Sequence, residues 1–178
     1  FRALLTDRLF LGAVLITGTG PAFCAGGDVK SMGSGPTSAP RSAAERIAEL
    51  RDRQLRLTGA LHALPKPTLA ALPGPAAGAG LALALACDLR IAAASAFVDT
   101  AYARIGLSGD YGISWLLTRL VGTARARELM FSAGRVTAAR CEALGLVNRV
   151  VPDEQLRGDA LAWAHALADG PGAALSLM

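Results

Sequence analysis

Residues 67–87 read PTLAALPGPAAGAGLALALAC and contain no charged side chain. A run of this length is nominally long enough to span a bilayer as a helix. A Pro-Gly-Pro sequence interrupts it, however, and the part that follows is rich in alanine and glycine. We therefore interpret the run as buried protein core, with a strand at 68–72, a glycine-rich turn at 74–80 and an apolar helix at 81–87.

Apolar segments on both sides of this run predict a buried sheet. Residues 12–17 (GAVLIT) lead into Gly-Thr-Gly-Pro and predict a strand that feeds a loop, and residues 88–92 (DLRIA) predict a further strand. Before the run, residues 41–64 carry apolar side chains at helical spacing with a charged opposite face. Strands that alternate with crossovers of this length pair in parallel, so the predicted fold class is α/β.

Helices dominate the pattern beyond Tyr111. Asp110 stands directly before this part of the chain and is a candidate N-cap of its first helix. The segment 33–40 (GSGPTSAP) is rich in small and helix-breaking residues, and we expect it to form a mobile loop within a single domain, 1–178. The expected C-terminal elements are helices at 111–120, 123–132, 137–144 and 153–168, and a strand-like segment at 146–151.

The composition excludes several classes of protein. Of the 178 residues, 52% are apolar and 18% are charged, which excludes an intrinsically disordered chain. Three widely spaced cysteines without a CxxC pair indicate neither a disulfide framework nor a metal site. The net charge is +4, but the arginines between residues 41 and 56 alternate with acidic residues, as on a solvated helix face. With no signal peptide apparent, we expect a cytoplasmic protein with neither a nucleic-acid nor a membrane partner.

Two glycine-rich turns each follow a predicted strand. The dinucleotide-binding fingerprint fails at both, because Phe23 and Leu83 stand where it requires a third small residue. The sequence contains no GxxxxGK[ST] and no GxSxG. A small-residue turn leaves backbone N–H groups unpaired, and two converging groups of this kind can bind a developing enolate oxygen. Residues 25–28 and 79–80 are the candidates, with ordinary strand-to-helix turns as the alternative.

Four motifs, in this order, resemble the crotonase (enoyl-CoA hydratase/isomerase) superfamily. They are FCAGGDVK at 23–30, the turn and apolar helix at 74–92, the segment at 106–122, and EALGLVN with VVP at 142–152. The resemblance implies a spiral of ββα units, with parallel buried sheets and surrounding helices, assembled into homotrimers or hexamers. It also implies an acyl-CoA substrate, with coenzyme A as part of the substrate rather than a bound cofactor. Further strands before Phe1 and helices after Met178 are expected by the same comparison.

The resemblance assigns binding roles to two pairs of residues. The oxyanion donors fall on the backbone N–H groups of Gly27 and Ala79, between which the thioester carbonyl would lie. The adenine end of coenzyme A falls near Ala25 and Lys30, where a lysine beside a phosphate is chemically sensible. A solvated loop lysine is the alternative interpretation of Lys30.

The acid–base positions depart from the pattern of the family's hydratases. Those enzymes use two glutamates, and the matching positions here carry Ala82 and Tyr102, neither of which can act as a carboxylate base. Asp110 matches a position at which relatives such as epoxyphenylacetyl-CoA isomerases use an aspartate, so it is the catalytic candidate, with helix capping as the alternative. Ala82, Tyr102 and Tyr111 are candidates to line the acyl pocket.

Three functions remain open on these residues. The leading hypothesis is an enzyme that isomerises the double bond of an enoyl-CoA, with Asp110 as the base and the thioester enolate stabilised by the two N–H groups. The first alternative is hydration of a 2-enoyl-CoA without the usual glutamates. The second is an acyl-CoA-binding protein with little turnover, which the alanine at position 82 favours.

Overall fold

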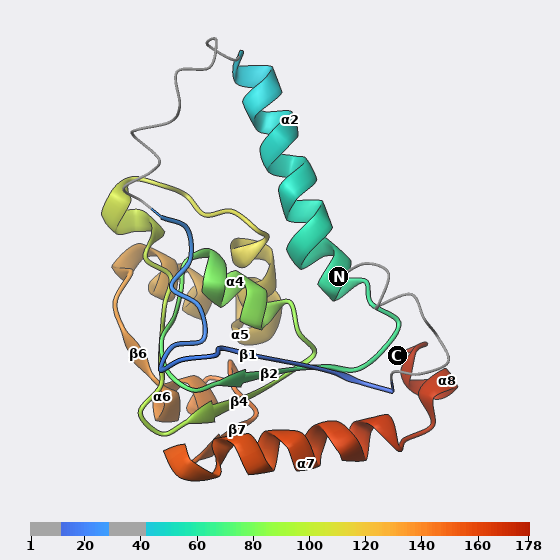
Figure 1. The fold of residues 1–178 in the computed structure, drawn as a ribbon. Coiled ribbons are helices and arrows are strands. Elements are labelled where there is room, and N and C mark those ends of the chain that lie inside the picture. The colour runs from blue at the N-terminus through green and yellow to red at the C-terminus, as the bar shows by residue number, and fades with distance from the viewer. Residues whose placement is uncertain (1–11, 29–41) are drawn as a thin grey trace.

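The computed structural model describes residues 12–28 and 42–178 and is built on two sheets (Figure 1). All neighbouring strands of the larger sheet pair in parallel, whereas the smaller sheet has one parallel and one antiparallel pair. The α/β fold class with a parallel sheet is therefore confirmed. The strand order is β1 (Val14–Thr17), β2 (Thr68–Leu72), β4 (Leu89–Ala93) and β7 (Arg149–Val151) in the larger sheet, and β3 (Ala76–Ala77), β5 (Phe97–Asp99) and β6 (Val136–Thr137) in the smaller one.

The uncharged run forms the middle of the core. Every residue of β2 is buried, and the apolar helix is α4 (Ala79–Leu85). Leu69, Leu72 and Leu81 are each at most 1% exposed. Within the ranges 12–28 and 42–178, no helix is long and apolar enough to cross a bilayer. The interpretation of the run as strand, turn and buried helix is confirmed, and the turn also contains the short strand β3.

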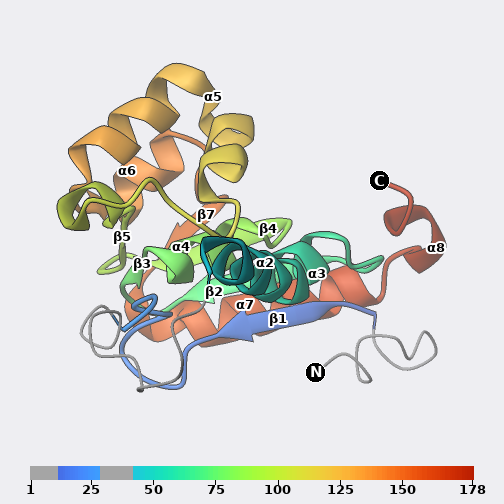
Figure 2. The same cartoon turned by 90° about the horizontal axis from the view of Figure 1, so that it is seen from above.

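Helices cover both faces of the larger sheet. α7 (Leu156–Ala168) packs against β1, β2 and β4, and α4 lies on the opposite side (Figure 1). Viewed from above, α5 (Ile113–Ser132) and α6 (Ala138–Ala143) lie together on the side of the molecule away from β1 (Figure 2). The remaining elements are α2 (Ala43–Gln54), the π-helical turn η2 (Leu55–Gly59), α3 (Ala60–His62), the 3₁₀ turns η3 (Tyr102–Ile105) and η4 (Asp153–Gln155), and α8 (Gly172–Leu175).

A buried arginine joins the end of α4 to the sheet. The Arg90 guanidinium donates hydrogen bonds to the carbonyl oxygens of Leu146 and Cys87, each at 2.6 Å. Burial lowers the pKa of Arg90, and the carbonyl acceptors compensate part of the cost of desolvating its charge. Directly before the same strand, β4, the Asp88 carboxylate accepts hydrogen bonds from the N–H and hydroxyl of Thr68 on the neighbouring strand β2, at 2.8 and 2.7 Å. Both contacts fix the strands from which the candidate site projects.

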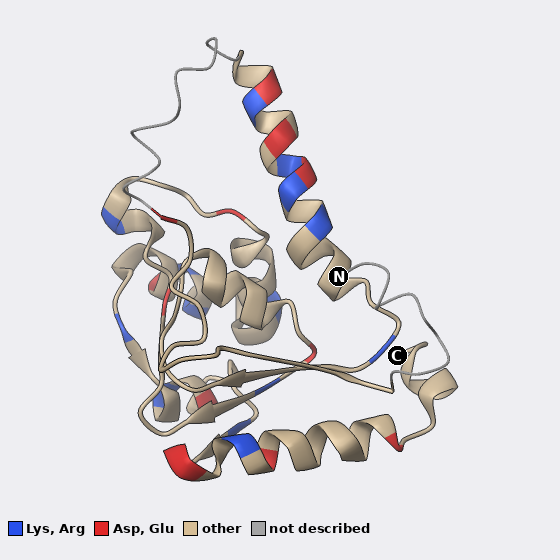
Figure 3. Ribbon diagram, viewed as in Figure 1, with Lys and Arg blue, Asp and Glu red and all other residues tan. Residues whose placement is uncertain are grey.

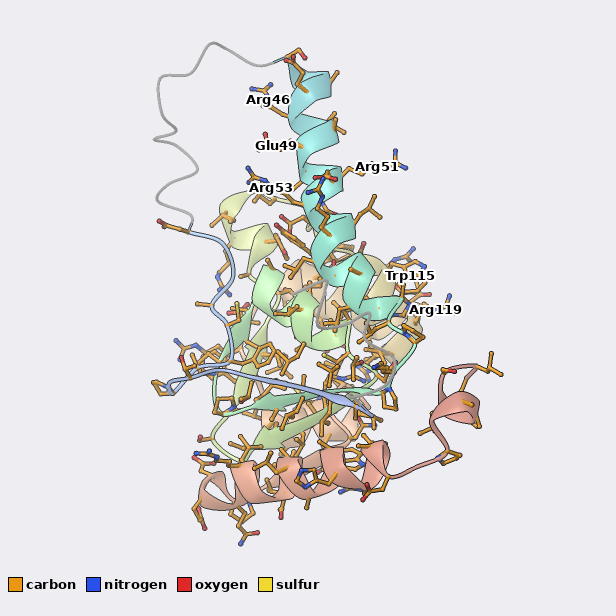
Figure 4. All side chains as sticks on the ribbon, turned by 45° about the vertical axis from the view of Figure 1, so that its right-hand side comes forward. Arg46, Glu49, Arg51, Arg53, Trp115 and Arg119 are labelled. Carbon is orange, nitrogen blue, oxygen red and sulfur yellow. The ribbon has the colours of Figure 1, made fainter. Side chains whose placement is uncertain are left out.

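α2 extends away from the sheets and buries none of its side chains (Figure 1). Ser42 and Glu45 form a capping box at its start, and arginines alternate with acidic residues along it (Figure 3). The predicted helix at 41–64 is thus confirmed over 43–62, including η2 and α3. At its C-terminal end, His62 meets Trp115 edge-on at 5.2 Å between ring centroids, and Arg119 stacks on the same indole (Figure 4).

The prediction that Asp110 caps a helix beginning at residue 111 is wrong. The helix is α5, and its N-cap is Gly112, with no side-chain hydrogen bond at the cap. The reason lies in the backbone, because Tyr111 (φ 49) and Gly112 (φ 78) both adopt the left-handed conformation and delay the helix to Ile113. Only a backbone turn remains, in which the Ile113 N–H donates to the Asp110 carbonyl at 3.1 Å. The Asp110 carboxylate is therefore available for another partner.

Other boundaries differ from the sequence prediction in detail. The expected helices at 111–120 and 123–132 are the two parts of α5, which is broken at Gly122 (φ 76, ψ 165). The helix at Thr137 is confirmed as α6, with the Thr137 side chain as its N-cap, whereas the strand-like segment at 146–151 is a strand only over β7. The predicted mobile loop at 33–40 lies outside the described residues.

Candidate active site

The two glycine-rich turns lie against each other. Cys24 forms a parallel bridge with Ala76, and the Ala77 N–H donates to the Cys24 carbonyl at 2.9 Å. The Cys24 N–H in turn donates to the Pro75 carbonyl at 3.2 Å. These bonds place the turn at 24–28 beside the turn that leads into α4, as the predicted pair of converging donors requires.

Two glycines permit this close approach. A Cβ atom on Gly80 would lie 2.2 Å from the Cys24 carbonyl oxygen, which is too close for any side chain. Gly26 has φ +88, and a Cβ there would lie 2.7 Å from the Ala77 carbonyl oxygen and 3.3 Å from the Ala79 nitrogen. The glycines thus serve backbone packing between the turns, a role that differs from the nucleotide-binding use excluded above.

Each turn presents an unpaired backbone donor. Among the described residues, neither the Gly27 nor the Ala79 N–H donates a hydrogen bond. Ala79 is the first residue of α4, where an N–H has no partner within the helix, and Gly27 lies in an exposed turn. Two such donors on adjoining turns can stabilise the negative oxygen of an enolate.

Asp110 reaches this region through Tyr102. The Tyr102 hydroxyl donates a hydrogen bond to Oδ1 of Asp110. The same ring lies beside the second turn, since a Cβ on Gly78 would be 3.9 Å from Cζ of Tyr102. Burial, followed by the bond to Asp110, raises the pKa of the Tyr102 phenol well above its ordinary value, so the hydroxyl stays protonated as a donor. The structure therefore joins Asp110 to the Gly78–Ala79 turn by a single side chain.

The sequence profile of the enoyl-CoA hydratase/isomerase family matches residues 2–178. The chain belongs to this family. A probable enoyl-CoA hydratase EchA12 from Mycobacterium tuberculosis is 42% identical over 152 residues, which are 80% of this chain and 50% of that protein. A 1,2-epoxyphenylacetyl-CoA isomerase from Escherichia coli is 37% identical over 165 residues, or 93% of this chain and 62% of that protein. This member of the family thus spans about half to three-fifths of the length of these relatives.

Solved structures with the crotonase fold match the chain closely. An enoyl-CoA hydratase from Polaromonas sp. JS666 superposes with a TM-score of 0.83 and 38% identity, over 93% of this chain and 63% of that one. An enoyl-CoA hydratase from Bacillus anthracis superposes with a TM-score of 0.86 and 30% identity, over 99% of this chain and 67% of that one. The expected crotonase-like fold is confirmed, while the relatives' names include both hydratases and an isomerase.

The other site residues predicted for this crotonase-family chain differ in how far they are buried. Ala82 is completely buried within α4, Ala25 is exposed in the first turn, and Tyr111 is partly buried next to Asp110. Lys30 lies outside the described residues. The structure therefore places the turn that contains Gly27 against the turn that leads to Ala79, and it joins Tyr102 to Asp110.

Asp99 and Arg104 hold the segment around Tyr102, a contribution to the site that sequence reasoning did not assign to them. The Asp99 carboxylate accepts a hydrogen bond from the Ala101 N–H at 2.8 Å and forms an ion pair with Arg104 at 2.7 Å. The Asp99 carbonyl also accepts the Gly78 N–H at 3.0 Å, which ties the second turn to the same strand. The only local signal is an aspartate two residues before the amide it caps, a common turn pattern with no functional meaning by itself.

The ionisation of Tyr102 provides a test of this geometry. Because its pKa is raised on folding, the bound proton stabilises the native state below pH 10, and this stabilisation is lost as the pH rises above the ordinary tyrosine pKa of 10.0. Tyr102 and Tyr111 are the two tyrosines of the chain. Near pH 10 we expect native protein to show less tyrosinate absorbance than urea-unfolded protein, and Tyr102→Phe to reduce this difference. Equal tyrosinate signals in the two states would contradict the buried phenol.

Proposed function

We propose that this chain carries the core of an enoyl-CoA isomerase. The chain is a member of the enoyl-CoA hydratase/isomerase family. The observation that carries the proposal is the position of Asp110, held by Tyr102 beside the turn that contains the unpaired Ala79 N–H. A carboxylate next to an oxyanion-binding turn has the two parts that proton transfer alpha to a thioester requires.

The substrate would bind with its thioester carbonyl between the two turns. The Gly27 and Ala79 N–H groups would donate to the carbonyl oxygen, and their contribution would grow as negative charge develops there. By family resemblance, Ala25 and Lys30 would hold the adenine end of coenzyme A. The chain would act within a homotrimer or a hexamer, which sedimentation analysis of the purified protein can distinguish from a monomer.

The reaction needs one base that works twice. Asp110 would remove a proton from C2 of a 3-enoyl-CoA, and the electron pair of that C–H bond would enter the enolate held by the two N–H groups. The enolate would then take the proton back at C4, which moves the double bond from C3–C4 to C2–C3. Proton transfer of this kind consumes no water and needs no second carboxylate, in agreement with Ala82 and Tyr102 at the hydratase positions.

Hydration of a 2-enoyl-CoA is the second candidate. It is favoured by several relatives of 39–42% identity that are named probable enoyl-CoA hydratases. Water addition would, however, require Asp110 alone to orient and deprotonate the water, because Ala82 has no polar side-chain atom. An acyl-CoA-binding protein with little turnover is the third candidate.

Incubation of the wild-type chain with a 3-enoyl-CoA and, separately, a 2-enoyl-CoA distinguishes these functions. The position of the double bond and the addition of water are followed by proton NMR, and binding is followed by calorimetry with coenzyme A and a saturated acyl-CoA. Isomerisation of the 3-enoyl-CoA without hydration supports the proposal. Hydration as the main reaction would replace it with the second candidate, and acyl-CoA binding without conversion would replace it with the third.

A further inference from the structure

Tyr102 is held rigidly by the segment around it. The residue is 7% exposed and begins η3 directly after Ala101, which adopts the left-handed conformation at φ 62. That conformation is uncommon for alanine and is fixed here by the bond from the Ala101 N–H to Asp99. Arg104, which also donates to the Ala133 carbonyl, clamps the other side of the turn by its ion pair with Asp99. The direction of the phenol is therefore set by the backbone.

Gly109 and the second turn both lie close to the Tyr102 ring. A Cβ on Gly109 would lie 2.9 Å from Cγ2 of Ile113, 3.5 Å from Cε of Met130 and 3.9 Å from Cδ2 of Tyr102, so Gly109 lies close both to apolar side chains of α5 and to the ring. The second turn packs on the ring at Gly78. At the end of the ring, the hydroxyl donates its hydrogen bond to Oδ1 of Asp110.

Asp110 itself lacks the support that a helix terminus would give. No side-chain hydrogen bond caps α5, so the carboxylate is not fixed by the N–H groups at the start of that helix. Its backbone lies between Gly109 (φ 107) and Tyr111 (φ 49), both in the left-handed region. The side-chain hydrogen bond described for this carboxylate in the structure is the one from Tyr102. Oδ1 accepts that bond, whereas Oδ2 accepts no side-chain hydrogen bond from the residues that the structure describes.

We infer that Tyr102 is a positioning residue for proton transfer by Asp110: its phenol holds Oδ1 and thereby selects Oδ2 as the atom that removes the substrate proton and returns it. This inference rests on the proposed isomerase function. The proton moves from C2 to Oδ2 and then from Oδ2 to C4, so atoms and charge balance within the substrate and one carboxyl group. A carboxyl held in this way keeps the transferred proton on the side of the substrate, whereas a freely rotating carboxyl exposes it to exchange with water.

Tyr102→Phe tests this role, because it removes one oxygen atom and keeps the ring that packs on Gly78. With a 3-enoyl-CoA that carries deuterium at C2, we expect kcat to fall about 10- to 100-fold with KM little changed, as for the loss of one hydrogen bond to a charged group. The fraction of deuterium recovered at C4, measured by mass spectrometry, should fall as well. A residue with only a structural role would not change that fraction.

Thr100→Val is the matched control. Thr100 is buried two residues away, and its hydroxyl donates to the Leu129 carbonyl at 2.9 Å rather than to Asp110. We expect this variant to lose stability in thermal unfolding but to keep kcat and the deuterium fraction. A second measurement tests the contact even if Tyr102→Phe unfolds. In the single variant Asp110→Asn, the NMR signal of the Tyr102 ring carbon bonded to oxygen should shift relative to that of the wild type.

The outcomes separate this inference from the proposed function. An active wild type with unchanged kcat and deuterium transfer in Tyr102→Phe overturns the positioning role and leaves the isomerase proposal intact. Equal losses of activity in Tyr102→Phe and Thr100→Val also overturn it, because the effect would then be structural. A wild type that does not isomerise overturns the proposed function, and the inference fails with it.

Discussion

Asp110→Asn is expected to reduce isomerisation by about 10²- to 10⁴-fold in kcat, the usual contribution of a general base. Asparagine has nearly the same shape as aspartate and offers an amide oxygen to the Tyr102 hydroxyl, but it cannot accept a proton from C2. The loss should therefore appear in kcat, while the binding of a saturated acyl-CoA changes little. Steady-state kinetics with a 3-enoyl-CoA and calorimetric titration with the saturated ligand measure the two quantities separately.

Asp153→Asn serves as the control for this substitution. The Asp153 carboxylate accepts the Ser95 N–H at 3.0 Å, and hydrogen bonds from the side chain and then the backbone of Ser95 hold its pKa below the ordinary value. Removing that charge should leave isomerisation unchanged. Wild-type activity in Asp110→Asn would show that the chain uses another base, and the catalytic assignment would have to be abandoned.

Ala79→Pro should lower kcat by about 10²- to 10³-fold, as does the loss of one oxyanion donor in other enzymes. Proline is tolerated at the first position of a helix, where its missing N–H has no partner, and Ala79 is the first residue of α4. The substitution thus deletes the proposed donor while preserving the helix. Kinetics with the 3-enoyl-CoA, together with thermal unfolding of each variant, measure the loss of activity and any loss of fold.

Ala43→Pro provides the same chemical change at the same helical position. Ala43 is the first residue of α2, the exposed helix that extends away from both turns. We expect Ala43→Pro to retain wild-type kinetics. If Ala79→Pro melts like the wild type and also retains full activity, the Ala79 N–H does not bind the enolate oxygen.

The long, regular parts of the fold could be predicted from the sequence because their patterns are strong. The uncharged run gave β2 and α4, since a charge-free segment broken by Pro-Gly-Pro fits a buried strand followed by a buried helix. β3 and β6 have two residues each and therefore no period to detect. Their existence depends on pairing with β5, which joins residues distant in sequence.

The candidate site was predictable in part. The proposed donors at Gly27 and Ala79 followed from the glycine-rich turns and the family resemblance, whereas Tyr102 was expected at a hydratase glutamate position and in the acyl pocket, without a bond to Asp110. Its bond to Asp110 depends on the left-handed backbone at Ala101 and Tyr111, where alanine and tyrosine give no local signal for such a conformation. The same backbone explains why helix capping, the alternative interpretation of Asp110, does not occur there.

The exposed position of α2 has a consequence for hydrogen exchange. Because the helix buries no side chain, its opening exposes little apolar surface and costs much less free energy than opening β2 and α4, whose residues fill the core. Its amide protons therefore exchange through local fluctuations that leave both sheets folded. We expect β2 and α4, in contrast, to open only at a much higher free-energy cost, so their amide protons should exchange more slowly than those of α2.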